Sequence, residues 1–177
     1  MKVSPHVVSF SCLLFLTASP FAFSQSKEYE LVLWNQYNGA AKDRGTRTCK
    51  IEAFAGTKVL WKMDRLEIPW EAGTDTKGSV KIPKFITRMD RIRITITQSI
   101  AIGGGLSEIE LFDGDENLAR KSMVSASAFF QSDKRFRPEL VIDGITSSKE
   151  MWVGYWLLPN EKELSRPGWI ELRLPRK

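Results

Sequence analysis

Histidine is nearly absent from this sequence, and its one copy, His6, lies close to the first residue. We expect His6 to be removed with an export signal, as argued below. A chain without histidine cannot form a Ser-His-Asp or Cys-His catalytic arrangement, a histidine zinc site or a histidine general base. Glycosidases use paired carboxylates instead, but the acidic residues here are scattered and no pair stands out. These absences favour a binding protein over an enzyme.

Cysteine and long apolar runs are also scarce. Exported proteins often contain disulfides, yet the sequence has only Cys12 and Cys49, and Cys12 lies in the expected leader. Cys49 then has no intramolecular partner, and we interpret it as a small buried apolar residue. The longest apolar run, residues 7–17, is too short to span a bilayer, so no transmembrane segment is expected.

The first 24 residues have the features of a secretory signal peptide. Lys2 is followed by the apolar run and then by Ala22-Phe23-Ser24, a small-x-small cleavage site. We predict a signal peptide over residues 1–24, export to the periplasm or the exterior, and one domain over residues 27–177. No cysteine lies at the cleavage point, which argues against a lipid anchor.

Charged residues of both signs are interleaved along the chain. The formal net charge is +5, without a block of one sign, which is typical of a solvated surface. Nucleic acid is not expected as the partner of an exported domain, whereas an anionic polysaccharide or lipid surface would suit a mildly basic one. Nothing in the sequence indicates an oligomeric state.

Alternation of apolar and polar residues is the strongest local pattern. Isoleucine alternates with arginine and threonine in residues 91–97, and isoleucine and leucine alternate with glutamate in residues 108–111. Each segment predicts a strand with one buried and one wet face. The glycines at 103–105 between them predict a flexible connection. No P-loop pattern or amphipathic helix follows them, which argues against a phosphate-binding loop.

Further short strands predict the fold class. No amphipathic helix of ten or more residues is present, and Gly/Pro turns separate the strands, which together indicate an all-β sandwich or barrel. Tryptophans at strand positions are expected in the core. The additional predicted strands are 29–34, 46–54, 57–61, 80–82, 122–126, 154–158 and 169–174, and the strand tryptophans are Trp34, Trp61, Trp156 and Trp169.

Several short motifs follow one another in the second half of the sequence, namely Asn117-Leu118-Ala119, Val124–Ser127, Pro138–Gly144, Trp152 and Gly168–Leu174. In this order, residues 117–174 resemble the first half of a discoidin, or coagulation factor 5/8 type C, module. The second half of such a module is similar to residues 29–112, through Glu30–Trp34, Thr46–Trp61 and Met89–Phe112. The resemblance implies a discoidin-like (galactose-binding-like) jelly-roll β-sandwich with its halves in circularly permuted order and its chain ends close together.

The alternative is that half of a module has been lost and that residues 29–112 are unrelated. A lone half-sandwich would expose its core, so permutation is favoured.

The resemblance also implies a structural Ca²⁺. By residue match, Asp143 and Glu108 fill the carboxylate positions, and hard oxygen ligands suit calcium. The sequence departs from the family pattern, because Ser148 stands where threonine is expected and Trp152 comes two positions late. An ordinary turn at Asp143-Gly144 is the alternative reading.

Ligand recognition in discoidin-like modules lies in loops at one end of the sandwich. The resemblance maps two of these loops to residues 129–137 and 35–45, which are expected side by side. Aromatic and donor groups there suit a sugar, and the cationic excess favours an acidic or sulfated one. The candidate ligand-binding residues are Tyr37, Asn38, Lys42, Arg44, Phe129, Phe130, Lys134 and Arg135. Alternatively, the aromatic rings plug the end of the sandwich and the charges solvate it.

The leading functional hypothesis is therefore an exported, non-catalytic carbohydrate-binding module. A protein-interaction or cell-surface assembly module with no glycan ligand comes second. A carboxylate-dependent hydrolase is a distant third, because no pair of carboxylates stands out in the sequence. Fold alone does not give function, so the binding hypothesis rests on the resemblance together with the missing catalytic groups.

Overall fold

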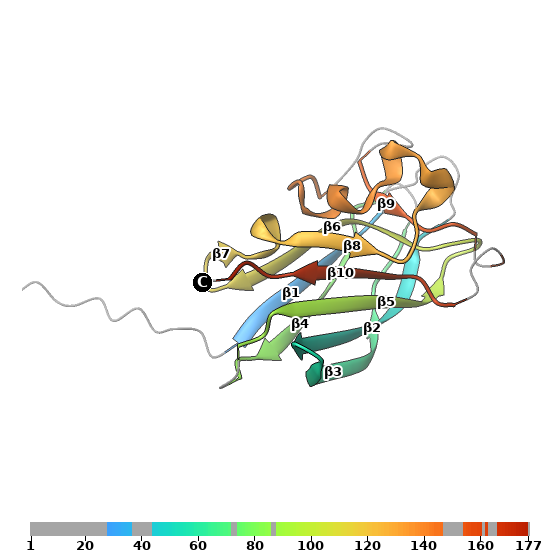
Figure 1. The fold of residues 1–177 in the computed structure, drawn as a ribbon. Helices are drawn as coiled ribbons and strands as arrows, with labels where there is room; N and C mark the ends of the chain where they lie inside the picture. Colours follow the sequence, from blue (N-terminus) through green and yellow to red (C-terminus); the bar gives the residue numbers. More distant parts are fainter. Residues whose placement is uncertain are drawn as a thin grey trace, which may run out of the picture.

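Two antiparallel β-sheets packed face to face make up the computed structural model of this chain (Figure 1). The structure describes residues 28–36, 44–71, 74–85, 88–146, 154–160, 162 and 166–176. The predicted signal peptide lies outside the described residues, and its removal stays a prediction. The chain is an all-β sandwich, as the strand pattern predicts.

Five strands form each sheet. In the first sheet the order is β4 (Lys77–Pro83), β1 (Glu28–Asn35), β6 (Gly105–Asp113) and β7 (Glu116–Asn117), and β9 (Trp156–Leu157) also pairs with β6. In the second sheet the order is β3 (Lys58–Glu67), β2 (Thr46–Ala55), β5 (Arg91–Ser99), β10 (Trp169–Arg173) and β8 (Met123–Ala126). Figure 1 shows that β1 begins at the same end of the sandwich at which the chain ends.

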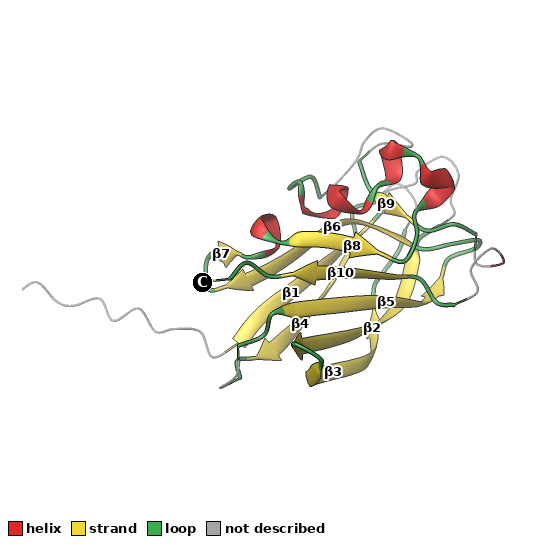
Figure 2. Ribbon diagram, viewed as in Figure 1, coloured by secondary structure: helices red, strands yellow, loops and turns green. Residues whose placement is uncertain are grey.

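Short 3₁₀ turns lie on both sides of β8 in the segment between β7 and β9. They are η1 (Ala119–Lys121), η2 (Phe130–Ser132), η3 (Lys134–Phe136) and η4 (Pro138–Ile142), drawn in red in Figure 2. Two of them, η2 and η3, occupy the segment 129–137 that the resemblance predicts to be a loop. No helix among the described residues has the length and apolar character needed to cross a membrane.

The core lies between the sheets and is built by the alternating residues. All five residues predicted to point inward are buried, namely Ile92, Ile94, Ile96, Ile109 and Leu111. Leu31 and Leu33 of β1 lie beside Ile109 and Leu111 in the first sheet and belong to the same core. Cys49 is also fully buried, as predicted, and burial raises the pKa of its thiol to about 12.

Two of the four strand tryptophans lie on outer faces rather than in the core. Trp156 is fully buried and Trp61 packs against the core, as predicted. Trp34 instead donates from Nε1 to Glu110 at 2.8 Å, and the Lys77 ammonium lies 4.6 Å from the centre of its ring. Trp169 lies under the Arg93 guanidinium, 4.6 Å from the ring centre. A large aromatic ring that packs against a lysine or arginine side chain can lie on the solvent side of a sheet as readily as in the core.

Close packing explains the glycines at 103–105, which were expected to form a flexible connection. A Cβ on Gly105 would lie 2.5 Å from the Trp156 carbonyl oxygen, and one on Gly104 would lie 2.8 Å from Ile96 Cγ2. The Thr46 hydroxyl also donates to the Gly105 carbonyl at 2.8 Å. These glycines therefore allow β6 to approach β9 and the core closely.

We expect Gly105→Ala to destabilise the fold by about 1–3 kcal/mol, because the added methyl group overlaps backbone that cannot move freely. Gly114→Asn is the matched control, since Gly114 has a φ of 64°, an open surround and a conformation that asparagine tolerates. Urea unfolding of both variants measures the difference. Equal stabilities would contradict the packing role of Gly105.

Candidate functional site

The two predicted ligand loops meet at one end of the sandwich. The Arg44 guanidinium lies 4.3 Å from the centre of the Phe130 ring, so the described parts of the segments 35–45 and 129–137 are in contact. Arg44 also donates to the Leu158 carbonyl at 3.3 Å and to Asn160 Oδ1 at 2.6 Å. The expected juxtaposition of these two loops is confirmed where the structure describes them.

This contact is largely buried. Arg44 is only 5% exposed, and the half-buried Phe130 packs edge-on against Phe136, with ring centres 5.6 Å apart. Phe136 in turn packs against Tyr155, and with Leu157 they form a small second core. Phe129 packs against the main core. The rings of this loop therefore close the end of the sandwich. Arg44, Phe129 and Phe130 expose little surface that a ligand could contact.

Two other predicted ligand residues are open to solvent. Lys134 is exposed, and so is Arg135, whose guanidinium donates to Asp133 at 3.0 and 2.7 Å. Those hydrogen bonds hold the pKa of the Asp133 carboxyl below its usual value. Tyr37, Asn38 and Lys42 lie outside the described residues, so their role stays a prediction.

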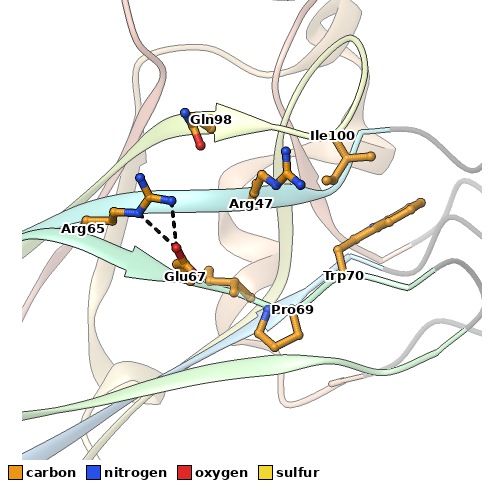
Figure 3. A pocket seen from close by; sticks show the side chains of 8 residues that line it. Arg47, Arg65, Glu67, Pro69, Trp70, Gln98 and Ile100 are labelled. Carbon is orange, nitrogen blue, oxygen red and sulfur yellow. Dashed lines mark hydrogen bonds and ion pairs between the residues drawn. The ribbon is translucent and has the colours of Figure 1, made fainter.

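An open cleft of about 470 Å³ lies beside this end, on the outer face of the second sheet (Figure 3). We call it the Trp70 cleft. Its lining residues are Arg47, Arg65, Glu67, Ile68, Pro69, Trp70, Gln98 and Ile100. Backbone hydrogen bonds join it to the Arg44 contact, because Arg44 N donates to the Ile100 carbonyl at 3.0 Å and Ile100 N donates to that of Gly45 at 2.6 Å.

Sequence reasoning missed this cleft. The signal was an aromatic residue in a proline-containing loop, Pro69-Trp70, next to strands that carry outward arginines. The proline in this loop predicts only a break between strands. Its proximity to Arg47 comes from pairing of β2 with β3, which the linear sequence does not display.

Two features position Trp70: the absence of a side chain on Gly45, and hydrogen bonds that hold the loop at Pro69. A Cβ on Gly45 would lie 2.1 Å from Trp70 Cδ1, so the indole packs where only glycine leaves room. Asn35 Nδ2 donates to the Thr46 carbonyl at 2.8 Å and to the Pro69 carbonyl at 2.9 Å. Thr46 N donates back to Asn35 Oδ1 at 2.9 Å. One amide therefore ties the start of β2 to the loop that carries Trp70.

The charges of the Trp70 cleft do not cancel. Arg65 donates to Glu67 at 3.1 and 2.7 Å, which neutralises this pair. The exposed side chain of Arg47 has no hydrogen bond or ion pair with any described residue, and neither does that of Gln98. The cleft thus offers one uncompensated guanidinium and one free amide beside an aromatic wall.

A second candidate site surrounds Glu108, which was expected on the wet face of its strand. Glu108 is instead fully buried, because the segment from η4 to Thr146 covers the outer side of β6. Its Oε1 accepts from Gly144 N at 3.1 Å, and its Oε2 is buried without a partner among the described residues. Burial raises the pKa of Glu108 to about 8; the Asp143 carboxylate adds to this, while the Gly144 hydrogen bond and Arg120 oppose it.

These carboxylates fit a hard cation in part. Asp143 and Glu108 meet at this site, and the unpartnered Oε2 offers a ligand atom of the kind that calcium prefers. The Arg120 guanidinium competes, because it packs against Gly144. No cluster of three or more histidine, cysteine, aspartate or glutamate side chains occurs within the described residues. Main-chain carbonyls of the turn would have to complete the shell.

Comparison with known proteins gives no relative, since no protein-family model, no curated protein and no solved structure matches this chain.

We expect calcium to stabilise the fold if Asp143 and Glu108 bind it. At a free calcium concentration about 100 times Kd, the free energy of unfolding should rise by about 2.7 kcal/mol, because only the folded state holds the ion. Melting curves in excess calcium and in chelator measure the shift, and Asp143→Asn should abolish it. Coincident curves for the parent protein would remove the site.

Without calcium, Glu108 should make stability depend on pH. Its pKa rises from the ordinary 4.5 to about 8 on folding, so between these values the unfolded chain has lost a proton that the folded chain keeps. Stability should therefore fall as the pH rises from about 5 to 8, by up to about 1.4 kcal/mol per unit, and then level off. Denaturant titrations of the parent and Glu108→Gln in chelator test this, and parallel pH profiles would contradict it.

Proposed function

We propose that this chain is an exported, non-catalytic module that binds carbohydrate at the loop end of its sandwich. One observation carries the proposal: the Trp70 cleft combines an aromatic wall with free polar groups in an open hollow of about 470 Å³. That volume lies in the range of small-molecule sites, which pair apolar walls with a few directed polar groups.

The chemistry of the cleft suits a sugar ring. A pyranose has an apolar face of C–H groups, which an indole can cover, and a rim of hydroxyls that need hydrogen-bond partners. Trp70, Pro69 and Ile100 supply the apolar surface. Arg47, Arg65 and Gln98 supply donors, and Glu67 and the Gln98 carbonyl supply acceptors.

The proposed fold type is a discoidin-like jelly roll in circularly permuted order. Three features support it: two antiparallel sheets, a shared core, and the placement of the start of β1 and the end of the chain at one end of the sandwich. In such modules recognition lies in loops, and the Trp70 cleft opens beside the Arg44–Phe130 contact.

Trp70→Ala should lower glycan affinity about tenfold or more, because losing an aromatic contact costs about 1 kcal/mol beyond the area it buries. A glycan array probed with the chain from residue 27 onward would first identify the ligand, and titration calorimetry would then compare variants. Trp34→Ala, on the outer face of the first sheet, is the matched control and should bind as the parent does. Arg135→Ala tests the predicted loop surface in the same assay.

Two results would contradict the proposal. One is an array without any bound glycan while the protein remains folded by circular dichroism. The other is equal affinity of the parent and Trp70→Ala at unchanged melting temperatures. Binding of a protein ligand through the same face would favour the interaction-module alternative.

A further inference from the structure

The uncompensated charge of the Trp70 cleft limits what can bind there. Three ionised side chains line the cleft, and the Arg65–Glu67 pair leaves Arg47 as the excess positive charge. Among the described residues, no carboxylate is within ion-pair distance of Arg47. A sugar unit with a single negative charge would balance the cleft, whereas a unit with several negative charges would meet repulsion from Glu67.

Arg47 is held at a fixed position relative to the aromatic wall. Its carbonyl accepts a hydrogen bond from Ile68 N at 2.9 Å, which ties β2 directly to the loop that carries Pro69 and Trp70. Figure 3 shows Arg47 projecting between the Arg65–Glu67 pair on one side and Trp70 and Ile100 on the other. A ligand's anionic group that binds Arg47 would therefore belong to the same sugar unit that contacts the Trp70 indole.

We propose that the Trp70 cleft selects a carboxylated sugar, a uronic acid residue of an acidic polysaccharide. This inference rests on the proposed function and names its ligand class. Arg47 receives the carboxylate through two parallel N–H···O hydrogen bonds, a pairing that the planar guanidinium forms well. Trp70 packs on the ring face, and Gln98 and Glu67 bond the remaining hydroxyls.

A carboxylate suits this cleft better than a sulfate ester. Both carry one charge, but the carboxylate is planar and presents two oxygens to one guanidinium, as the single unpaired Arg47 requires. A sulfate ester has three terminal oxygens in a tetrahedral arrangement. One guanidinium edge binds two of them, so the third would have no partner on Arg47, and the ionised Glu67 carboxylate cannot donate a hydrogen bond to it.

Titration calorimetry with three probes tests the selection. The probes are oligogalacturonate, the same oligomer fully methyl-esterified, and dextran sulfate. The parent protein should bind oligogalacturonate about tenfold or more tightly than the ester, because esterification removes the charge-assisted hydrogen bonds. Its affinity for the acid should fall with added salt, and its affinity for the ester should not.

Variants assign the effect to Arg47. Arg47→Gln should lose the preference for the acid over the ester, and Arg47→Lys should keep only part of it, since an ammonium is a point charge without the planar fork. Arg173→Gln is the matched control, because Arg173 is an exposed arginine of the same sheet that lies outside the cleft. It removes the same charge and should keep the parent's selectivity.

The outcomes separate this inference from the function on which it rests. Equal binding of acid and ester, preference for dextran sulfate, or identical selectivity of Arg47→Gln and Arg173→Gln would overturn the carboxylate assignment and leave glycan binding intact. Failure of every glycan to bind the folded protein would overturn both. Loss of selectivity in Arg47→Gln alone, with an unchanged melting temperature, would establish the assignment.

Discussion

Packing of the isoleucine face of β5 against the leucine faces of β1 and β6 is the contact on which the rest of this structure depends. Ile92, Ile94 and Ile96 are buried there, and each buried side chain of this size contributes about 1.5–3 kcal/mol. Because side chains alternate along a strand, burying these residues forces Arg91 and Arg93 outward. The outer face of the second sheet carries charged side chains for this reason, and one end of that face holds the Trp70 cleft.

The outer faces are not uniformly wet, however. On the second sheet, Arg91 stacks 4.3 Å from the Phe54 ring centre and also pairs with Glu171. On the first sheet, a returning segment covers Glu108, a residue that alternation alone places in water. A polar residue on the outer side of a strand is solvated only where nothing folds back over it.

The fold was predictable to the extent that its information is local. Alternation identified β5 and β6, and turn residues separated most of the other strands. The triple glycine was misread as flexible, because its cause is the approach of Trp156 from a segment about fifty residues away. Trp34 and Trp169 were misplaced because residue type indicates a large ring but not the face that carries it.

The candidate site was predictable only in part. The resemblance brought the segments of Arg44 and Phe130 together correctly, and it paired Asp143 with Glu108. It gave no indication that Arg44 would be buried, since this depends on Asn160 and Leu158, more than a hundred residues further along. Trp70 and Arg47 escaped notice because neither belongs to a motif, and only strand pairing makes them neighbours.

The Asn35 amide has a consequence for how tightly a ligand could be held. It satisfies the Thr46 amide and carbonyl and the Pro69 carbonyl at once, and the Thr76 hydroxyl also donates to Pro69. The two sides of the Trp70 cleft are thereby joined before anything enters it. A ligand would not have to order a loose loop, so little conformational entropy would be lost on binding and even a small contact area could give measurable affinity.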